Sequence, residues 1–161
     1  MEKCVRKATP ADMDALLDLL LYVADCHSSQ RGELFCTGRA AYTREELLHF
    51  METGSMQIFV SADETGAVTG LILCKVQERA SDKILRDCRV VWVEDMSVAA
   101  SAQKEGYGKM LLDHVKEYGR SQGCSRLELN VWAFNESAHG FYIHEGMRDQ
   151  RHIMEYNLSK Q

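Results

Sequence analysis

The most constraining feature of the sequence is a β-rich run that leads through a glycine-bearing loop into an amphipathic helix. Residues 88–98 read CRVVWVEDMSV and residues 103–108 read QKEGYG; from Met110 onward, apolar side chains recur at the spacing of one helical face. A glycine inside a helix costs about 0.5–1 kcal/mol relative to alanine, so Gly106 and Gly108 need a reason. This order of elements aims backbone N–H groups at an anion such as a phosphate. A loop that merely needs positive φ is the alternative reading of the two glycines.

The remaining patterns predict an alternation of helices and strands around this feature. Thr9 to Asp12 and Thr43 to Glu46 have the form of helix-start capping boxes. Residues 63–66 (DETG) form a turn between two β-rich runs, which indicates a hairpin. The expected strands are 3–8, 56–62, 67–77, 88–98, 125–134 and 147–158, and the expected helices begin at 9, 43, 106 and 135 and end near 25, 54, 123 and 146.

Bulk composition limits the classes of function that remain. A chain of 161 residues that is 45% hydrophobic fits a single compact domain over residues 1–161. The formal net charge of −5 argues against a nucleic-acid partner held by a basic face. The six cysteines show no metal-ligand spacing, so no metal site is predicted. The first residues lack a signal-peptide core and the longest apolar run is too short to span a bilayer, so we expect a cytoplasmic protein with no membrane partner.

Two motifs carry a resemblance to a known family. Residues 103–108 have the form [QR]-x-x-G-x-[GA], and residues 135–142 have the form N-x-x-A-x-x-F-Y. At this separation and in this order of elements, the motifs resemble those of the GNAT (GCN5-related) N-acetyltransferases. The resemblance is specific over residues 91–157, and over residues 1–90 it depends on element order alone. It implies an α/β fold: a mixed, mostly antiparallel sheet with two splayed parallel strands and helices on both faces.

The same resemblance implies acetyl-coenzyme A as the cofactor and assigns residues to it. The end of the 88–98 strand pairs with the pantetheine, the glycine loop holds the pyrophosphate, and residues near the 135–142 motif line the other side. The residues so implied are Met96, Ser97, Val98, Gln103, Lys104, Glu105, Gly106, Tyr107, Gly108, Lys109, Asn130, Asn135, Ser137 and Tyr142. Glu105 departs from the family, which usually has a basic residue or glycine there. We therefore expect an outward side chain or weaker cofactor binding.

Acetyl transfer needs a neutral amine and a proton for the departing sulfur. Tyr142 matches the family tyrosine that protonates this sulfur. Val93, Glu94 and Asp95 are similar to the LED triplet of the spermidine/spermine-type branch, so one carboxylate is expected to take the amine proton. Because side chains alternate along a strand, only one should face the cleft, and we favour Glu94. The alternative is that both carboxylates only attract a cationic substrate. The backbone N–H of Met96 or Ser97 is the expected oxyanion donor.

The acceptor side is predicted from an aperiodic segment between the first two helices. Residues 26–41 are expected to form a flap that supplies His27 and Phe35 to the substrate, with Trp132 a third candidate. A solvated histidine and a packing tryptophan are the alternatives. We therefore expect an N-acetyltransferase for a primary amine of a small molecule or peptide, with a homodimer left open. There are two competing hypotheses. In one, the enzyme uses a different acyl-coenzyme A; in the other, the protein is a coenzyme A-binding regulatory module without turnover.

Overall fold

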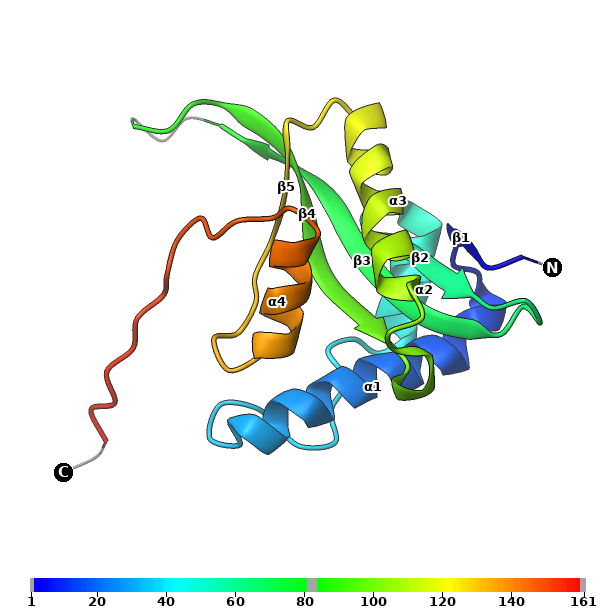
Figure 1. The fold of residues 1–161 in the computed structure, drawn as a ribbon, viewed down its shortest axis with the longest axis horizontal. Helices are drawn as coiled ribbons and strands as arrows, with labels where there is room; N and C mark the ends of the chain where they lie inside the picture. The colour runs from blue at the N-terminus through cyan, green and yellow to red at the C-terminus, as the bar shows by residue number, and fades with distance from the viewer. Residues whose placement is uncertain (1, 81–83, 160–161) are drawn as a thin grey trace. The chain divides into compact units, whose positions relative to one another are not determined.

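A computed structural model describes residues 2–80 and 84–159 of the chain. The chain divides into two compact units, Met1–Asn130 and Val131–Gln161. The ribbon of Figure 1 is coloured along the chain from blue to red, so the second unit is its orange and red part. The connection expected between the third and fourth strands falls partly outside the described residues.

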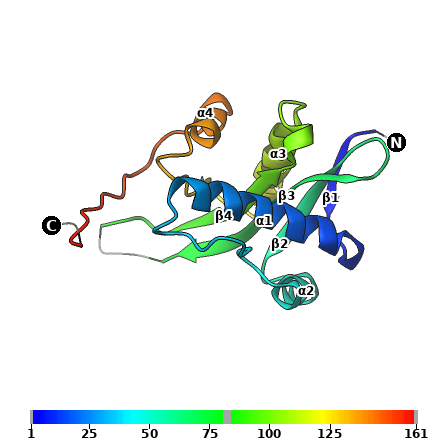
Figure 2. The same cartoon turned by 90° about the horizontal axis from the view of Figure 1, so that it is seen from below.

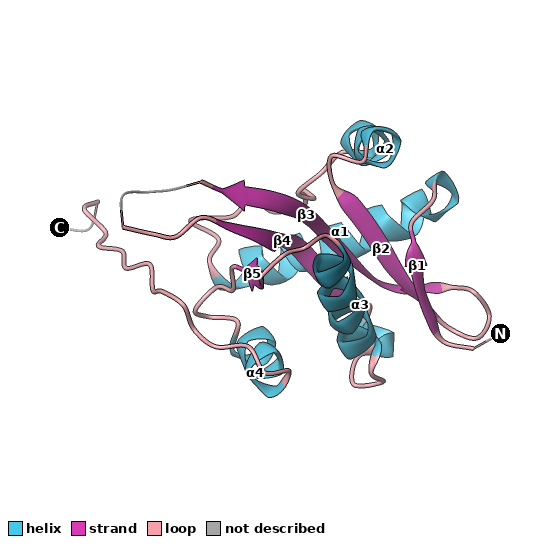
Figure 3. Cartoon of the chain, turned by 90° about the horizontal axis from the view of Figure 1, so that it is seen from above, coloured by secondary structure: helices cyan, strands magenta, loops and turns pink. Residues whose placement is uncertain are grey.

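The first unit is built on a five-stranded sheet in the order β1-β2-β3-β4-β5 (Figures 1 and 3). Neighbouring strands pair antiparallel, except that β4 and β5 are parallel. The strands are β1 (Cys4–Lys7), β2 (Gln57–Ala62), β3 (Val68–Arg79), β4 (Cys88–Val98) and β5 (Arg126–Leu129). The predicted mixed, mostly antiparallel sheet is therefore confirmed.

Helices α1 (Met13–Gln30) and α2 (Arg44–Thr53) cover one face of this sheet (Figure 2). Their apolar side chains pack with alternate residues of β2 and β3, such as Leu71 and Leu73, in one buried cluster. The capping box predicted for α2 is present, because the Thr43 hydroxyl accepts from the Glu46 N–H at 3.2 Å. Each leucine-sized side chain that is fully buried, rather than left exposed, contributes about 1.5–3 kcal/mol to the stability of the fold. The cluster therefore holds both helices on the sheet.

Helix α3 (Tyr107–Ser121) covers the opposite face (Figure 3). Leu111 and Val115 of α3 are fully buried against Ile72 of β3 and Val91 of β4. Because α3 follows β4 through the glycine loop, this packing fixes the position of that loop at one end of the sheet.

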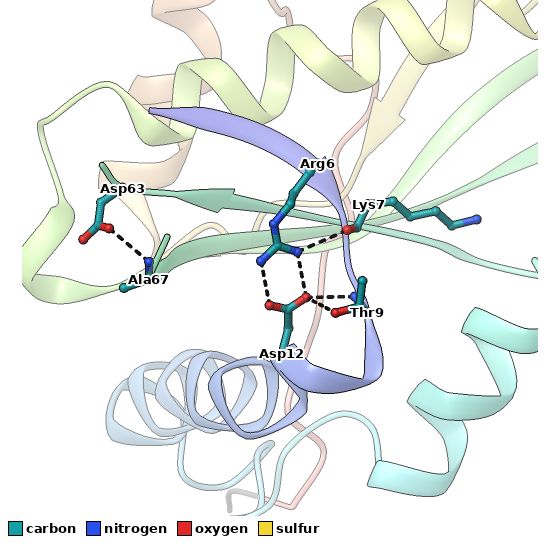
Figure 4. Close-up of polar contacts among 6 residues, drawn as sticks. All are labelled: Arg6, Lys7, Thr9, Asp12, Asp63 and Ala67. Atoms are coloured by element: carbon teal, nitrogen blue, oxygen red, sulfur yellow. Dashed lines mark hydrogen bonds and ion pairs between the residues drawn. The ribbon is translucent and has the colours of Figure 1, made fainter. Parts of the chain in front are cut away.

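A polar corner fixes the entrance to α1, as Figure 4 shows. The Arg6 guanidinium donates to both Asp12 carboxylate oxygens at 2.8 Å, and the Thr9 backbone N–H donates to the same carboxylate at 2.8 Å. These hydrogen bonds, those from Arg6 foremost, lower the pKa of Asp12 to about 2. They link β1 to a short 3₁₀ turn, η1 (Pro10–Asp12), that precedes α1. The β2–β3 turn is closed similarly, because the Asp63 carboxylate accepts from the Ala67 N–H at 3.0 Å.

Helix α1 continues to Gln30, five residues beyond the predicted end near residue 25. The expected flap was therefore wrong over its first five residues. The chain has no glycine or proline between Pro10 and Gly32 to stop the helix, and the Ser28 and Ser29 hydroxyls bond to helix carbonyls three residues back instead of breaking it. The loop between α1 and α2 comprises residues 31–43.

The second unit contains one helix, α4 (Glu136–His144), among its described residues. The prediction of a helix start at Asn135 is confirmed, because its side chain accepts from the Ala138 N–H at 3.1 Å. The strand predicted over residues 147–158 is wrong: no described residue of this segment is in a strand. A strand forms only with a hydrogen-bonded neighbour, which alternation of side chains cannot guarantee. No helix of the described residues is long and apolar enough to cross a membrane.

Candidate active site

Strand β4 contains one extra residue at Glu94. Leu73 of β3 pairs with Asp95, and the next β3 residue, Cys74, pairs with Val93, so Glu94 lies opposite no residue of β3. Such a bulge bends the strand and increases its local twist. The bulge is at the middle residue of the triplet Val93, Glu94 and Asp95, from which the catalytic carboxylate was predicted.

Both carboxylates lie on the face of the sheet covered by α1. Asp95 is opposite Leu73, which packs in the α1 cluster. The Glu94 carboxylate forms an ion pair with Lys75 (Oε1–Nζ 2.5 Å), and Lys75 shares the face of Leu73 because it is two residues further along β3. Alternation predicted that the two carboxylates face opposite ways. That prediction was wrong because the bulge interrupts the two-residue period.

The environment of Asp95 favours its neutral form. Burial raises the pKa of the Asp95 carboxyl to about 6, the Met96 backbone N–H donates to the carboxylate and opposes this rise, and the nearby Glu94 charge adds to it. Among the described residues, no lysine, arginine or histidine forms an ion pair with Asp95. The two carboxylates also affect Tyr42. Burial raises the pKa of the Tyr42 hydroxyl to about 12, and the negative charges of Glu94 and Asp95 add to this rise.

Asp95 lines a pocket of about 180 Å³ that we call the α1 pocket. One wall is a stripe of α1 that comprises Leu20, Val23, Ala24 and His27. The loop over residues 31–43 supplies a second wall, which includes Phe35 and Arg39. Figure 2 shows α1 lying across the sheet above β4, which explains how residues so distant in sequence line one pocket.

His27 is therefore a helix residue, although the sequence placed it in a loop. Its ring contacts Phe35, with centroids 5.1 Å apart, and burial lowers its pKa. The α1 pocket brings these two predicted substrate residues together with Asp95. Sequence reasoning missed Leu20, Val23 and Ala24, although they precede His27 at the spacings of one helical face.

Among the described residues, the end of β4 pairs with another strand along one edge only. Pairing with β3 continues to Val98, whereas pairing with β5 ends at Val93. The predicted cofactor strand, residues 96–98, therefore pairs on the β3 side only. The Ser97 hydroxyl is buried and, among the described residues, has no hydrogen-bond partner. Asn130 is exposed and directly follows β5, one residue beyond Leu129, the last β5 residue that pairs with β4.

The glycine loop enters α3 through a left-handed residue. Gly106 has φ of +90°, and a Cβ built there would meet no atom within 4 Å. Lys104 has φ of 65°, which is uncommon for a residue with a side chain. The Met110 N–H is bonded to the Gly106 carbonyl, so the amides of residues 107–109 precede the first helical hydrogen bond and point out of the helix end. The helix dipole favours an anion at this position.

Glu105, the residue that departs from the family pattern, is half-exposed and faces the amino-terminal segment. Its carboxylate lies 3.2 Å from the Lys3 ammonium, which also lies 4.5 Å from the centroid of the Tyr107 ring. The ion pair reduces the repulsion that this carboxylate would exert on a bound anion. Lys3 was not predicted to act near this loop, because nothing in the sequence indicates which residues β1 brings to α3.

The second unit contains the other predicted site residues. Tyr142 lies on α4 beside Phe141, with ring centroids 5.2 Å apart. Trp132 stacks on Phe134 with centroids 6.0 Å apart and planes at 15°. Asn135 caps α4, and Ser137 lies in its first turn. Metal-binding groups of three or more His, Cys, Asp or Glu side chains are absent from the described residues.

Comparisons with known proteins identify the family. A model of the GNAT acetyltransferase family matches residues 23–147. The chain therefore belongs to the GNAT acetyltransferase family, as the two motifs indicated. Assignment to its spermidine/spermine-type branch stays a prediction.

Two curated relatives carry acetyltransferase names. An uncharacterized N-acetyltransferase in the pepI 3′ region of Lactobacillus delbrueckii subsp. lactis is 32% identical over 101 residues, which is 62% of this chain and 56% of that protein. The uncharacterized N-acetyltransferase YhdJ of Bacillus subtilis (strain 168) is 35% identical over 52 residues, which is 32% of this chain and 37% of that protein. The chain thus spans about half or less of the length of these relatives.

Solved structures share the fold. The BH1408 protein from Bacillus halodurans, solved as a tetramutant, superimposes with a TM-score of 0.90 at 23% identity, covering 96% of this chain and 99% of that one. Glucosamine-6-phosphate N-acetyltransferase from Arabidopsis thaliana gives a TM-score of 0.68 at 20% identity and covers 99% of this chain and 100% of that one. At these identities the likeness establishes the fold.

Proposed function

We propose that this protein transfers an acetyl group from acetyl-coenzyme A to the primary amine of a small molecule, with Asp95 as the base. The observation that carries the proposal is a half-buried carboxylate without a cationic partner at the edge of a mostly apolar pocket. An ammonium group complements this carboxylate. A carboxyl group with a pKa of about 6 is ionised at neutral pH and is basic enough to take a proton.

The residues of the first unit fit acetyl-coenzyme A, the cofactor that GNAT proteins typically use. The glycine loop leaves open space where a side chain at residue 106 would stand, and its helix-end amides suit a pyrophosphate. The edge of residues 96–98 that no described strand pairs with suits an amide chain such as pantetheine. The bound cofactor supplies an activated acetyl thioester.

Each proton transfer is assigned to a residue of this chain. Asp95 accepts the proton that the acceptor ammonium loses, which exposes the nitrogen lone pair that forms the new bond to the acetyl carbon. The backbone N–H of Ser97, or that of Met96 once Asp95 has taken up the proton and holds this N–H less strongly, stabilises the negative charge that develops on the acetyl oxygen. The Tyr142 hydroxyl, assigned from the N-x-x-A-x-x-F-Y motif, gives its proton to the sulfur as the carbon–sulfur bond breaks. The second proton, which the nitrogen loses as the amide forms, restores this hydroxyl.

Asp95 is proposed in preference to Glu94, reversing the expectation from the sequence. Glu94 forms a 2.5 Å ion pair with Lys75, so its carboxylate already has a cationic partner, whereas Asp95 has none among the described residues. Asp95 lines the α1 pocket, whereas Glu94 is not among the residues that line it.

A matched pair of variants tests this assignment. Thiol release from acetyl-coenzyme A is followed with dithionitrobenzoate in the presence of a panel of amines. Asp95→Asn should lower kcat by about 10²–10⁴, the usual contribution of a positioned base, whereas Glu94→Gln should lower it less than about tenfold. A larger loss in Glu94→Gln would transfer the role of base to Glu94. Coenzyme A that binds while no amine releases thiol would indicate a binding module without turnover.

Tyr142→Phe tests the proposed acid. The variant should keep its fold and its coenzyme A affinity, measured by titration calorimetry, and lose about 10²–10⁴ in kcat. Unaltered turnover would mean that water or another group protonates the sulfur.

A further inference from the structure

The size of the α1 pocket limits the part of the acceptor that it can hold. Its volume is about 180 Å³ and its walls include Leu20, Val23, Ala24 and Phe35. An apolar cavity of about 150 Å³ is large enough for benzene. The α1 pocket therefore fits one aromatic ring or one short aliphatic chain.

Two oppositely charged side chains line this small apolar pocket. Asp95 lies on the β4 side and Arg39 on the exposed loop side. They form no ion pair with each other, and among the described residues neither has an ion-pair partner within 4.0 Å. His27, the other basic residue at the pocket, has a pKa lowered by burial and so is uncharged at neutral pH. The pocket thus presents one anion and one cation that do not neutralise each other.

A molecule that complements this arrangement has an ammonium group, a short apolar body and an anionic group. The Arg39 guanidinium presents paired donors that match a carboxylate. A polyamine would instead place a second ammonium group near Arg39, where like charges repel. The charge pattern therefore separates amino acids from the polyamines that the V-E-D triplet suggested.

We propose that the acceptor is an amino acid with an apolar body: Asp95 receives its amine, the α1 pocket encloses its body, and Arg39 binds its carboxylate. This inference depends on the proposed acetyl transfer for the role of Asp95. It assigns Arg39 to acceptor recognition and to no step of the chemistry.

Matched acceptors test the proposal because they differ only in the carboxylate. Leucine is compared with 3-methylbutylamine, and 5-aminopentanoate with butylamine; spermidine is the polyamine. In at least one pair the carboxylated member should have a KM at least about tenfold lower, equivalent to about 1.4 kcal/mol. Arg39→Gln should remove this preference and leave the KM of the plain amine within about twofold.

Arg44→Gln is the control variant, because Arg44 forms an ion pair with Asp14 (2.5 Å) and does not line the α1 pocket. It should retain the full preference for the carboxylated acceptor. If both pairs show equal KM values, or if spermidine is the best acceptor, the proposal is wrong.

A binding measurement separates this proposal from the proposed function. Titration calorimetry of leucine and 5-aminopentanoate is performed on the wild-type protein and on Arg39→Gln in the presence of coenzyme A. Binding that depends on Arg39 without any thiol release would support the pocket assignment and contradict acetyl transfer. Thiol release without a preference for carboxylated acceptors, or no binding of either amino acid, would contradict the pocket assignment.

Discussion

Asp95→Asn should make the protein more stable at neutral pH while it abolishes most activity. Burial raises the pKa of Asp95 from 3.8 to about 6, so the folded protein ionises this group only at a cost. The stability associated with its neutral form is fully present below 3.8 and is lost as the pH rises through about 6. Asparagine has nearly the same shape and never ionises, so it avoids this loss.

The magnitude follows from the same two pKa values. Linkage gives a difference in unfolding free energy between Asn and Asp of about 0.5 kcal/mol near pH 4 and about 3 kcal/mol near pH 8. The asparagine amide must itself be desolvated, which reduces the expected gain near pH 8 to about 1–2 kcal/mol. The Met96 N–H still finds an acceptor in the asparagine carbonyl oxygen.

Urea denaturation of the wild type, Asp95→Asn and Glu94→Gln at several pH values measures these differences. Glu94→Gln is the control: it removes a partly exposed ion pair with Lys75 and should change stability by less than about 1 kcal/mol. A loss of stability in Asp95→Asn that is equal near pH 4 and near pH 8 would contradict this prediction, because it would show that burial does not disfavour the ionised carboxylate.

Three further predictions concern other parts of the molecule. Asp12→Asn should have the opposite pH trend: the hydrogen bonds from Arg6 lower the pKa of Asp12 to about 2, so urea denaturation should show a loss of about 1–2 kcal/mol near pH 7 that disappears as the pH falls through about 2. Gly106→Val should weaken coenzyme A binding by more than about tenfold in titration calorimetry, because φ of +90° strains valine and its side chain would occupy the open space of the glycine loop; unchanged affinity in a folded variant would contradict the loop assignment. Phe35→Ala should raise the KM for the amine by about tenfold and leave coenzyme A affinity unchanged, since Phe35 lines the α1 pocket; the reverse pattern would place this loop at the cofactor.

Local signals in the sequence predicted the elements that local interactions determine. The capping boxes and the hairpin turn each satisfy their own backbone groups within a few residues, and the glycine loop depends on the positive φ of Gly106 itself. For that reason α2, the β2–β3 hairpin, β4 and α3 were predicted within a few residues of their observed bounds. Family membership was also predictable, because the two motifs are compact in sequence.

Features that depend on long-range pairing were not predictable in this way. The bulge at Glu94 arises from its register with β3 residues about twenty positions earlier, so alternation assigned the two carboxylates to opposite faces. The α1 pocket combines α1, a loop and β4, and only His27 and Phe35 were expected there along with the carboxylates. The prediction of a strand over residues 147–158 was wrong for the same reason, because the residues of a segment do not show whether another strand lies beside it to pair with.

The bulge has a consequence for changes in chain length. Val93 and Met96 both pack on the α3 side, and a regular strand needs only one residue between them to keep that arrangement. Deletion of Glu94 would therefore leave every remaining side chain of β4 on its present face, with Asp95 still directed toward α1. The strand would lose its bend, however, and could continue beside β5 beyond Val93. We therefore expect that the identity of residue 94 can vary widely, and that its presence keeps the two parallel strands apart.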